Sequence, residues 1–431
     1  MKRYSEYKDS GVKWIGEIPG HWKKNKIMRL FTHIGSGTTP KGDQYYTDES
    51  NGIPWINSGD LNYGVLTKCN KYITEKALND ISTLKKYPIN TLMIAMYGAS
   101  IGKYAISHIE GCTNQACCAL YGIKDELNLT YASYLMGPCK QKWIEESFGG
   151  TQPNISAEKI KQTWLPLPPL PEQEAIVTYL DSKVAKIDEY ISIAEKKIAA
   201  LEELKQTIIA EAVTRGIHKD VPMKDSGVKW IGMIPEHWKM NSLRSYVKLY
   251  SEKNHPEKQL LSVTREMGVI VRNTESKEEN HNFIPDDLSG YKLVRKGDFV
   301  INKMKSWQGS YGVSKYEGIV SPAYYVCKLK FPYNDFFSIA IRCKSYVPFF
   351  TQYSKGIRVD QWDLSPIALK NIPFMEPPIT EQQEIVTYIE AKAAKIDQLC
   401  QAERSQIEKL KEYKQRLISD VVTGKVKVTN D

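Results

Sequence analysis

The sequence lacks the long apolar runs and paired cysteines that define several protein classes. Its longest apolar stretch, residues 92–96, is far shorter than the roughly 18 residues needed to span a membrane. Its polar start, residues 1–10, has no signal-peptide core. The eight cysteines form no C-x-x-C pair, which argues against a disulfide scaffold or a zinc ribbon. We therefore expect a cytoplasmic protein with no membrane partner.

Familiar catalytic motifs are also missing. Residues 97–104 approach a P-loop but have tyrosine in place of the first glycine and tyrosine after the lysine. No G-x-G-x-x-G motif is present, and residues 371–374 only approach an amino-methyltransferase signature. The histidine and cysteines between residues 108 and 118 lack zinc-ligand spacing. We expect no catalytic residue, no metal and no cofactor in this chain.

Composition and charge favour a globular protein with an anionic partner. The 431 residues are 42% hydrophobic and 25% charged, which is typical of two or three folded domains. Lysine and arginine exceed aspartate and glutamate by 59 − 50 = 9. This surplus favours a partner such as nucleic acid.

The most informative feature is an internal repeat. Residues 8–23 (KDSGVKWIGEIPGHWK) return as residues 224–239 with 14 of 16 positions identical, which is far beyond chance. Residues 172–188 return as residues 381–397, and each copy follows a proline-rich stretch. Two nearly identical frames thus enclose two unlike bodies, which indicates two versions of one task.

The repeats predict a division of the chain into six segments. These are a first linker (1–23), a first body (24–164), a proline-rich turn with a first long helix (165–217), a second linker (218–239), a second body (240–373) and a second turn with a long helix (374–431).

Within the bodies, short β-branched and aromatic runs predict a mixed α/β structure. Residues 93–96 and 102–107 weakly resemble residues 300–303 and 309–314, at an offset of 207, which predicts a shared fold. The expected strands are 52–56, 92–97, 298–301 and 323–326, and the expected helices are 128–136 and 336–346.

Each frame predicts a long helix with a heptad seam. The first runs from Glu172 to about Arg215, and Gly216 and Gly424 stand where the two helices should end. Lys205 and Lys414 occupy equivalent seam positions and are expected to pair with an acid such as Glu403. The seam residues are Leu180, Ile187, Ile191, Leu201, Ile208, Ile389, Ile396, Ile407, Leu410 and Leu417.

The pattern predicts an α+β fold. Two mixed α/β domains are joined by two long antiparallel coiled-coil helices with pseudo-two-fold symmetry. The alternative is that each helix closes its own domain as part of an ordinary helical hairpin.

Both bodies carry polar segments suited to DNA. Lysines suit phosphates, and asparagine or glutamine can read adenine through paired donor and acceptor contacts. The candidates in the first body are Thr39, Lys41, Lys103, Asn114, Gln115 and Gln152. The candidates in the second body are Lys303, Lys305, Trp307, Gln308, Ser310 and Arg358. The alternative for each is an ordinary role, since turn asparagines cap the backbone and tryptophans usually pack in cores.

The doubled frame resembles the specificity subunit (HsdS) of type I restriction–modification enzymes. The segments 34–40, 97–102 and 113–115 also look like the target recognition domains of that family. The resemblance implies that each body reads one half of a bipartite double-stranded DNA sequence, while the paired helices act as a spacer.

The resemblance also implies a division of labour. Two methyltransferase (HsdM) subunits would bind S-adenosylmethionine and methylate adenine at N6, and two restriction (HsdR) subunits would use ATP and Mg. This chain would be non-catalytic. The alternatives are a self-contained DNA methyltransferase or nuclease, and a coiled-coil adaptor without DNA recognition.

Overall fold

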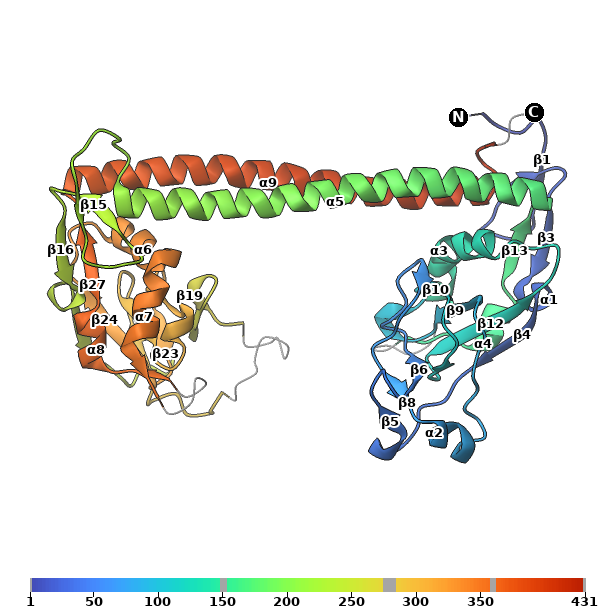
Figure 1. The fold of residues 1–431 in the computed structure, drawn as a ribbon, viewed down its shortest axis with the longest axis horizontal. Coiled ribbons are helices and arrows are strands. Elements are labelled where there is room, and N and C mark those ends of the chain that lie inside the picture. The colour runs from blue at the N-terminus through green and yellow to red at the C-terminus, as the bar shows by residue number, and fades with distance from the viewer. Residues whose placement is uncertain (1, 148–152, 274–283, 357–361, 429–431) are drawn as a thin grey trace. The chain divides into compact units, whose positions relative to one another are not determined.

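The structure, a computed structural model, describes residues 2–147, 153–273, 284–356 and 362–428. The chain divides into two compact units. Unit 1 contains residues 1–194 and 405–431, and unit 2 contains residues 195–404. Unit 1 is therefore assembled from two stretches that are far apart in the sequence (Figure 1).

The elements of unit 1 precede and include the first part of the first long helix. They are β1 (Tyr7–Asp9), β2 (Glu17–Pro19), β3 (Lys23–Lys26), α1 (Ile27–Leu30), β4 (Phe31–Ser36), η1 (Asp43–Tyr45), β5 (Tyr46–Thr47), β6 (Ile53–Ile56), β7 (Val65–Leu66), β8 (Tyr72–Ile73), α2 (Glu75–Asp80), β9 (Thr91–Ala95), η2 (Gly98–Ser100), β10 (Tyr104–Ser107), β11 (Cys112–Thr113), β12 (Cys117–Ile123), α3 (Leu129–Glu145), α4 (Ala157–Lys161), β13 (Trp164–Leu167) and α5 (Leu170–Arg215).

Unit 1 is built around a sheet with the order β4-β12-β9-β10-β7. Its central strand β9 is buried at every position, and four of its five residues are apolar. Helix α3 covers one face of the sheet and lies between it and α5 (Figure 1). Tyr134 Oη of α3 donates to Asp181 Oδ1 of α5 at 2.6 Å. A smaller sheet, β11-β6-β8-β5, packs beside the first.

The elements of unit 2 follow α5 and include the first part of the second long helix. They are β14 (Met223–Asp225), β15 (Met233–Pro235), β16 (Lys239–Ser242), η3 (Leu243–Ser245), β17 (Val247–Tyr250), β18 (Leu261–Thr264), β19 (Gly268–Val271), β20 (Lys292–Val294), β21 (Phe299–Asn302), η4 (Ser306–Gln308), β22 (Tyr311–Val313), β23 (Gly318–Val320), β24 (Tyr324–Leu329), α6 (Asn334–Arg342), η5 (Lys344–Tyr346), α7 (Val347–Tyr353), β25 (Ser354–Lys355), β26 (Asp363–Leu364), α8 (Pro366–Asn371), β27 (Pro373–Glu376) and α9 (Ile379–Val422).

Unit 2 repeats the central sheet of unit 1, with the order β17-β24-β21-β22. Ala95 pairs with Cys117 in unit 1, and Asn302 pairs with Tyr324 in unit 2. Both partners are displaced by the same offset of 207 (302 − 95 and 324 − 117), so the strand registers are equivalent. The weak repeat in the sequence therefore does mark one fold used twice.

Helices α5 and α9 run antiparallel to one another within each unit. In unit 1, Lys414 Nζ lies 2.7 Å from Asp188, and in unit 2, Lys205 Nζ lies 2.7 Å from Asp397. The seam lysines therefore pair with aspartates, and Glu403 pairs instead with Lys197. These contacts and the mixed sheets confirm the predicted α+β fold with paired long helices.

All ten predicted seam residues are buried or half-buried. Six of them are buried, namely Leu180, Ile187, Ile389, Ile396, Ile407 and Leu417. The remaining four are half-buried, namely Ile191, Leu201, Ile208 and Leu410.

Each frame anchors its body through a carboxylate in the first turn of a long helix. Glu172 accepts hydrogen bonds from Tyr4 Oη, from His21 Nε2 at 2.8 Å and from Trp22 Nε1 at 3.1 Å. The equivalent Glu381 accepts from His237 Nε2 at 2.7 Å. These hydrogen bonds thus join each linker repeat to the first turn of the long helix in the same unit.

Two predicted helix boundaries are wrong. The helix expected over 128–136 is α3 and continues to Glu145, with Pro138 inside it, because its buried face packs continuously against the sheet. The helix expected over 336–346 ends at Arg342, since Cys343 is extended and a new short helix follows. Over the described residues, none of the helices combines the length and apolarity that a bilayer crossing needs.

Candidate nucleic-acid interface

Three loops of unit 1 leave the central sheet at the same edge. Strands β4 and β9 end there and β12 begins there, because β12 is antiparallel to both and Cys117 and Cys118 pair with Ala95 and Ser36. The loops 37–42, 96–103 and 113–116 therefore converge. We call this edge, formed by these three loops, the reading edge of unit 1.

Hydrogen bonds join the first and third of these loops. The backbone N–H of Thr38 donates to the carbonyl of Thr113 at 3.0 Å, and Thr39 Oγ1 donates to Gln115 Oε1 at 2.6 Å. Gly37 is required beneath them, because a Cβ there would lie 1.6 Å from the Thr113 carbonyl oxygen. The glycine-rich loop is thus fitted against the segment that carries the amide side chains.

The predicted contact residues of unit 1 differ in accessibility. Lys41 and Gln115 are exposed, and Lys103 is half-buried in the hairpin between β9 and β10. Asn114 is half-buried, and its side chain donates to Asn57 Oδ1 at 3.1 Å and accepts from the N–H of Ala116 at 3.1 Å. Its amide is occupied by the fold, so Gln115 is the freer amide. Gln152 lies outside the described residues.

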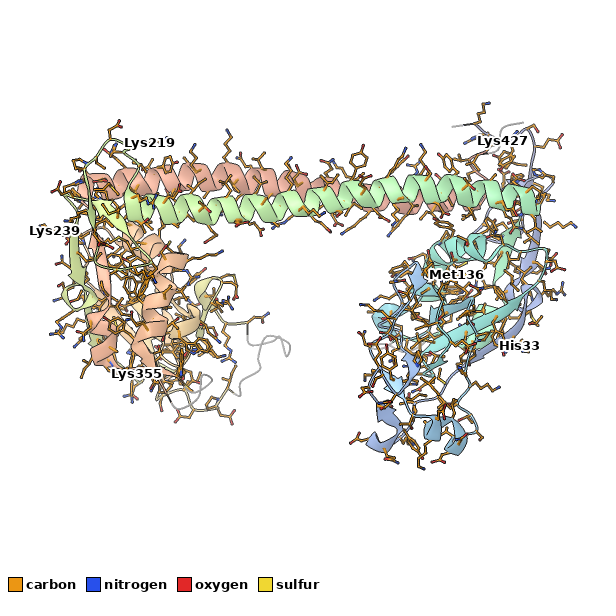
Figure 2. The ribbon with its side chains drawn as sticks, in the orientation of Figure 1. His33, Met136, Lys219, Lys239, Lys355 and Lys427 are labelled. Atoms are coloured by element: carbon orange, nitrogen blue, oxygen red, sulfur yellow. The ribbon has the colours of Figure 1, made fainter. Side chains whose placement is uncertain are left out.

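Unit 2 has an equivalent reading edge. Strand β21 ends at Asn302 and β24 begins at Tyr324 beside it, so the loops 303–310 and 321–323 converge. The hairpin β25–β26 joins them, because the N–H of Leu364 donates to the carbonyl of Lys303 at 3.1 Å. Lys355, on this hairpin, lies far from the frame residue Lys239 within unit 2 (Figure 2).

The predicted contact residues of unit 2 are also unequal. Lys303 Nζ lies 2.8 Å from Asp363, and this hydrogen bond raises the pKa of the lysine. Lys305 is exposed and Gln308 is half-buried. Ser310 is only 3% exposed, which leaves its hydroxyl group below the surface. Arg358 lies outside the described residues.

Trp307 packs within the reading edge of unit 2. Its ring meets Trp362 edge-on at 5.6 Å, and its Nε1 donates to the carbonyl of Met304 at 3.2 Å. The carbonyl of Trp307 accepts from Thr351 Oγ1 at 3.0 Å. These contacts give the half-buried tryptophan a role in shaping the loop.

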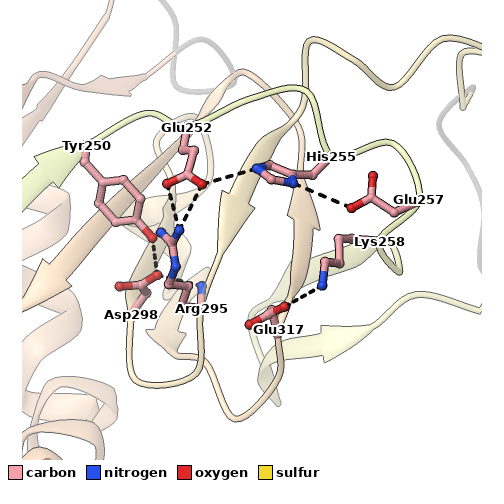
Figure 3. A network of polar contacts seen from close by, with 8 residues as sticks. All are labelled: Tyr250, Glu252, His255, Glu257, Lys258, Arg295, Asp298 and Glu317. Atoms are coloured by element: carbon pink, nitrogen blue, oxygen red, sulfur yellow. Dashed lines mark hydrogen bonds and ion pairs between the residues drawn. The ribbon is translucent and has the colours of Figure 1, made fainter.

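A polar network fixes another loop of unit 2, residues 251–258, that the sequence analysis missed. Glu252 accepts from the guanidinium of Arg295 at 2.8 Å and lies 3.2 Å from His255 Nε2 (Figure 3). Lys258 Nζ lies 2.7 Å from Glu317. The loop follows β17 as the glycine-rich loop of unit 1 follows β4. Its density of alternating charges was the available signal.

The cysteines between residues 108 and 118 do not form a reactive or metal-binding group. Burial raises the pKa of Cys112 to about 11 and the pKa of Cys117 to about 12, so both remain protonated thiols. Among the residues that the structure describes, no three histidine, cysteine or acidic side chains gather as metal ligands.

Comparisons with known proteins agree with the doubled architecture. Residues 19–203 match a family described as "Type I restriction modification DNA specificity domain". Residues 19–203 therefore form a type I specificity domain. This specificity domain contains the body of unit 1 and the first part of α5.

The similarity to type I specificity subunits extends beyond that domain. The chain is 25% identical to the "Putative type I restriction enzyme MjaX specificity subunit" of Methanocaldococcus jannaschii, over 98% of both chains. It is 26% identical to the EcoR124I/EcoR124II specificity subunit of Escherichia coli, over 42% of this chain and 44% of that one. The predicted similarity to type I specificity subunits is confirmed.

A solved structure supports the same fold over nearly the whole chain. One chain of a structure described as "Structural basis underlying complex assembly and conformational transition of the type I R-M system" aligns with a TM-score of 0.65. The alignment covers 94% of this chain and 98% of that one at 14% identity. The family match ends at residue 203 and so leaves out nearly all of unit 2. The structural alignment includes unit 2, which therefore shares the fold as well.

Proposed function

We propose that the protein is the DNA-specificity subunit of a type I restriction–modification system. Each body reads one half of a bipartite double-stranded DNA target, and the paired helices act as the spacer between the two readings. The observation that carries this proposal is one sheet used twice, with the same edge furnished by different side chains. Two readers with a common fold and different loops are what recognition of two unlike half-sites requires.

The proposal assigns the chemistry to partner proteins. Two methyltransferase subunits bind S-adenosylmethionine and transfer its methyl group to adenine N6, and two restriction subunits use ATP and Mg. This chain supplies sequence recognition and needs no cofactor of its own. The complex works in the cytoplasm, where its DNA substrate is found.

Electrostatics and loop chemistry support DNA as the ligand. The net charge of +9 favours a polyanion. Exposed Lys41 and Lys305 stand on the two reading edges, where they can meet phosphates. The exposed Gln115 can offer its amide nitrogen to a base edge while its Oε1 accepts from Thr39 Oγ1. Phosphate contacts of this kind make affinity fall as salt concentration rises.

Exchange of one body tests the proposal. Residues 240–373 are replaced by the equivalent segment of a relative, the chain is expressed with its methyltransferase partner, and methylated adenines are mapped across a genome. One half of the methylated sequence should change while the other half stays the same. The reciprocal exchange of residues 24–164 is the matched control and should change only the opposite half. A change in both halves after either exchange would contradict modular reading.

The spacer has its own test. Insertion of one heptad lengthens a helix by about 10 Å. It should alter the number of unread base pairs or abolish binding. An unchanged target would contradict the spacer role.

A further inference from the structure

Both reading edges expose one large apolar side chain at the same place in the fold. Tyr97 is 43% exposed and Met304 is 52% exposed. Each stands two residues after the end of the central strand, β9 in unit 1 and β21 in unit 2. They are related by the offset of 207 that also relates the two strand registers. A single exposed apolar residue is ordinary, but the same exposure at equivalent positions of two dissimilar loops needs an explanation.

The backbone around Tyr97 is fixed by contacts on both sides. The N–H of Met96 donates to the carbonyl of Ala116 at 2.8 Å, and the N–H of Gly98 donates to the carbonyl of Pro153 at 2.7 Å. Tyr97 itself forms an antiparallel bridge with Asn154. The tyrosine is therefore presented from a rigid position.

The backbone around Met304 is fixed in a different way. Its own carbonyl accepts from Trp307 Nε1, and the carbonyl of Lys303 accepts from the N–H of Leu364. The N–H of Lys305 donates to the carbonyl of Asn302 at 3.0 Å. Two unrelated sets of contacts thus produce one result, a hydrogen-bonded backbone that carries an exposed apolar side chain just beyond the strand end.

Apolar side chains in DNA interfaces contact the carbon edge of pyrimidines, above all the thymine methyl group. We propose that Tyr97 and Met304 are specificity-determining residues, each making the apolar contact of its body with the C5 edge of one pyrimidine. This inference rests on the proposed function and names the residues through which each half-site is read. The different shapes of tyrosine and methionine then contribute to reading two different half-sites.

The test uses the full chain expressed with its methyltransferase partner and base-resolution mapping of methylation. Tyr97→Ala should relax the preference at one base pair of one half-site, and Met304→Ala at one base pair of the other. The expected loss of discrimination is about fourfold for each methyl-sized contact removed. Tyr97→Phe and Met304→Leu keep an apolar side chain and should retain the preference.

Matched controls lie at the opposite end of each sheet. Ile89 is 53% exposed and precedes β9, and Tyr316 is 41% exposed and follows β22. Ile89→Ala and Tyr316→Ala should leave the methylated sequence unchanged. Melting temperatures of all variants establish that they are folded.

The outcomes separate the inference from the proposed function. If the wild-type chain directs no sequence-specific methylation, the proposed function fails. If the wild type is specific and the two alanine variants keep its full preference, only the assignment of Tyr97 and Met304 fails. If an alanine variant does not fold, the decision passes to DNA carrying deoxyuridine in place of thymine or 5-methylcytosine in place of cytosine. Wild-type affinity should then change at one position in each half, and an unchanged affinity throughout overturns the inference.

Discussion

Replacing the frame carboxylates should destabilise the two units by different amounts. Glu172→Ala removes the acceptor for Tyr4, His21 and Trp22, whereas Glu381→Ala removes the acceptor for one histidine. A hydrogen bond to a charged group contributes about 1.5–3 kcal/mol, so two additional bonds make Glu172→Ala costlier by about 3 kcal/mol or more. Both carboxylates lie in the first turn of a long helix, so their interactions with the helix dipole cancel in the comparison.

Hydrogen exchange of the full chain measures the two effects separately. Amides of β3 report on unit 1 and amides of β16 report on unit 2, because these strands pair with the segments that lead into the two helices. Protection of β3 should fall further in Glu172→Ala than protection of β16 falls in Glu381→Ala. Glu174→Ala, at an exposed position of the same helix, is the control and should change stability by less than about 0.5 kcal/mol. Equal losses in the two units, or a larger loss in Glu381→Ala, would refute the reasoning.

Four further predictions concern stability and reactivity. Leu180→Ala, at a fully buried seam position, should lower the free energy of unfolding by about 2–5 kcal/mol. Leu204→Ala, at a 49% exposed position outside the seam, should lower it far less in the same urea titration. Gly424→Ala should cost more than about 1 kcal/mol, because φ is +78° and a Cβ would lie 2.3 Å from a proline Cδ; Gly232→Ala, with a similar φ and open space, should cost less. All eight cysteines are buried, so thiol reagents should modify the folded chain slowly. Burial raises the pKa of Cys117 from 9.0 to about 12, so as the pH rises this thiol ionises in the unfolded chain before it ionises in the folded chain. The free energy of unfolding should therefore fall between pH 9 and 12. A free energy of unfolding that stays flat across that range would count against this.

Much of the fold was predictable because the internal repeat marks where the long helices begin and end. Gly216 and Gly424 adopt φ values of +74° and +78° where the sequence placed the helix ends. The register of the helix pair was harder. Lys205 meets Asp397, and not Glu403, because long-range packing of the apolar seam decides which charges come opposite.

The candidate contact residues show where sequence reasoning loses information. Asn114 and Lys303 have the right chemistry for DNA, yet each is engaged by a partner about 60 residues distant, Asn57 and Asp363. Such pairings depend on tertiary structure, which a local motif does not encode. Met304 was passed over for the opposite reason, since an apolar residue between two lysines attracts notice only when its exposure is known.

The composition of unit 1 has a consequence for how the chain is made. Its core includes Leu417, Val421 and Val422 beside Leu180, and the hydroxyl of Tyr131 donates to the carbonyl of Val422 at 3.1 Å. A ribosome synthesises those residues only after all of unit 2. The body of unit 1 is synthesised first, but its core is complete only after the last turns of α9 have been made. A frameshift just upstream of the codon for Leu417 would thus remove part of the core of unit 1.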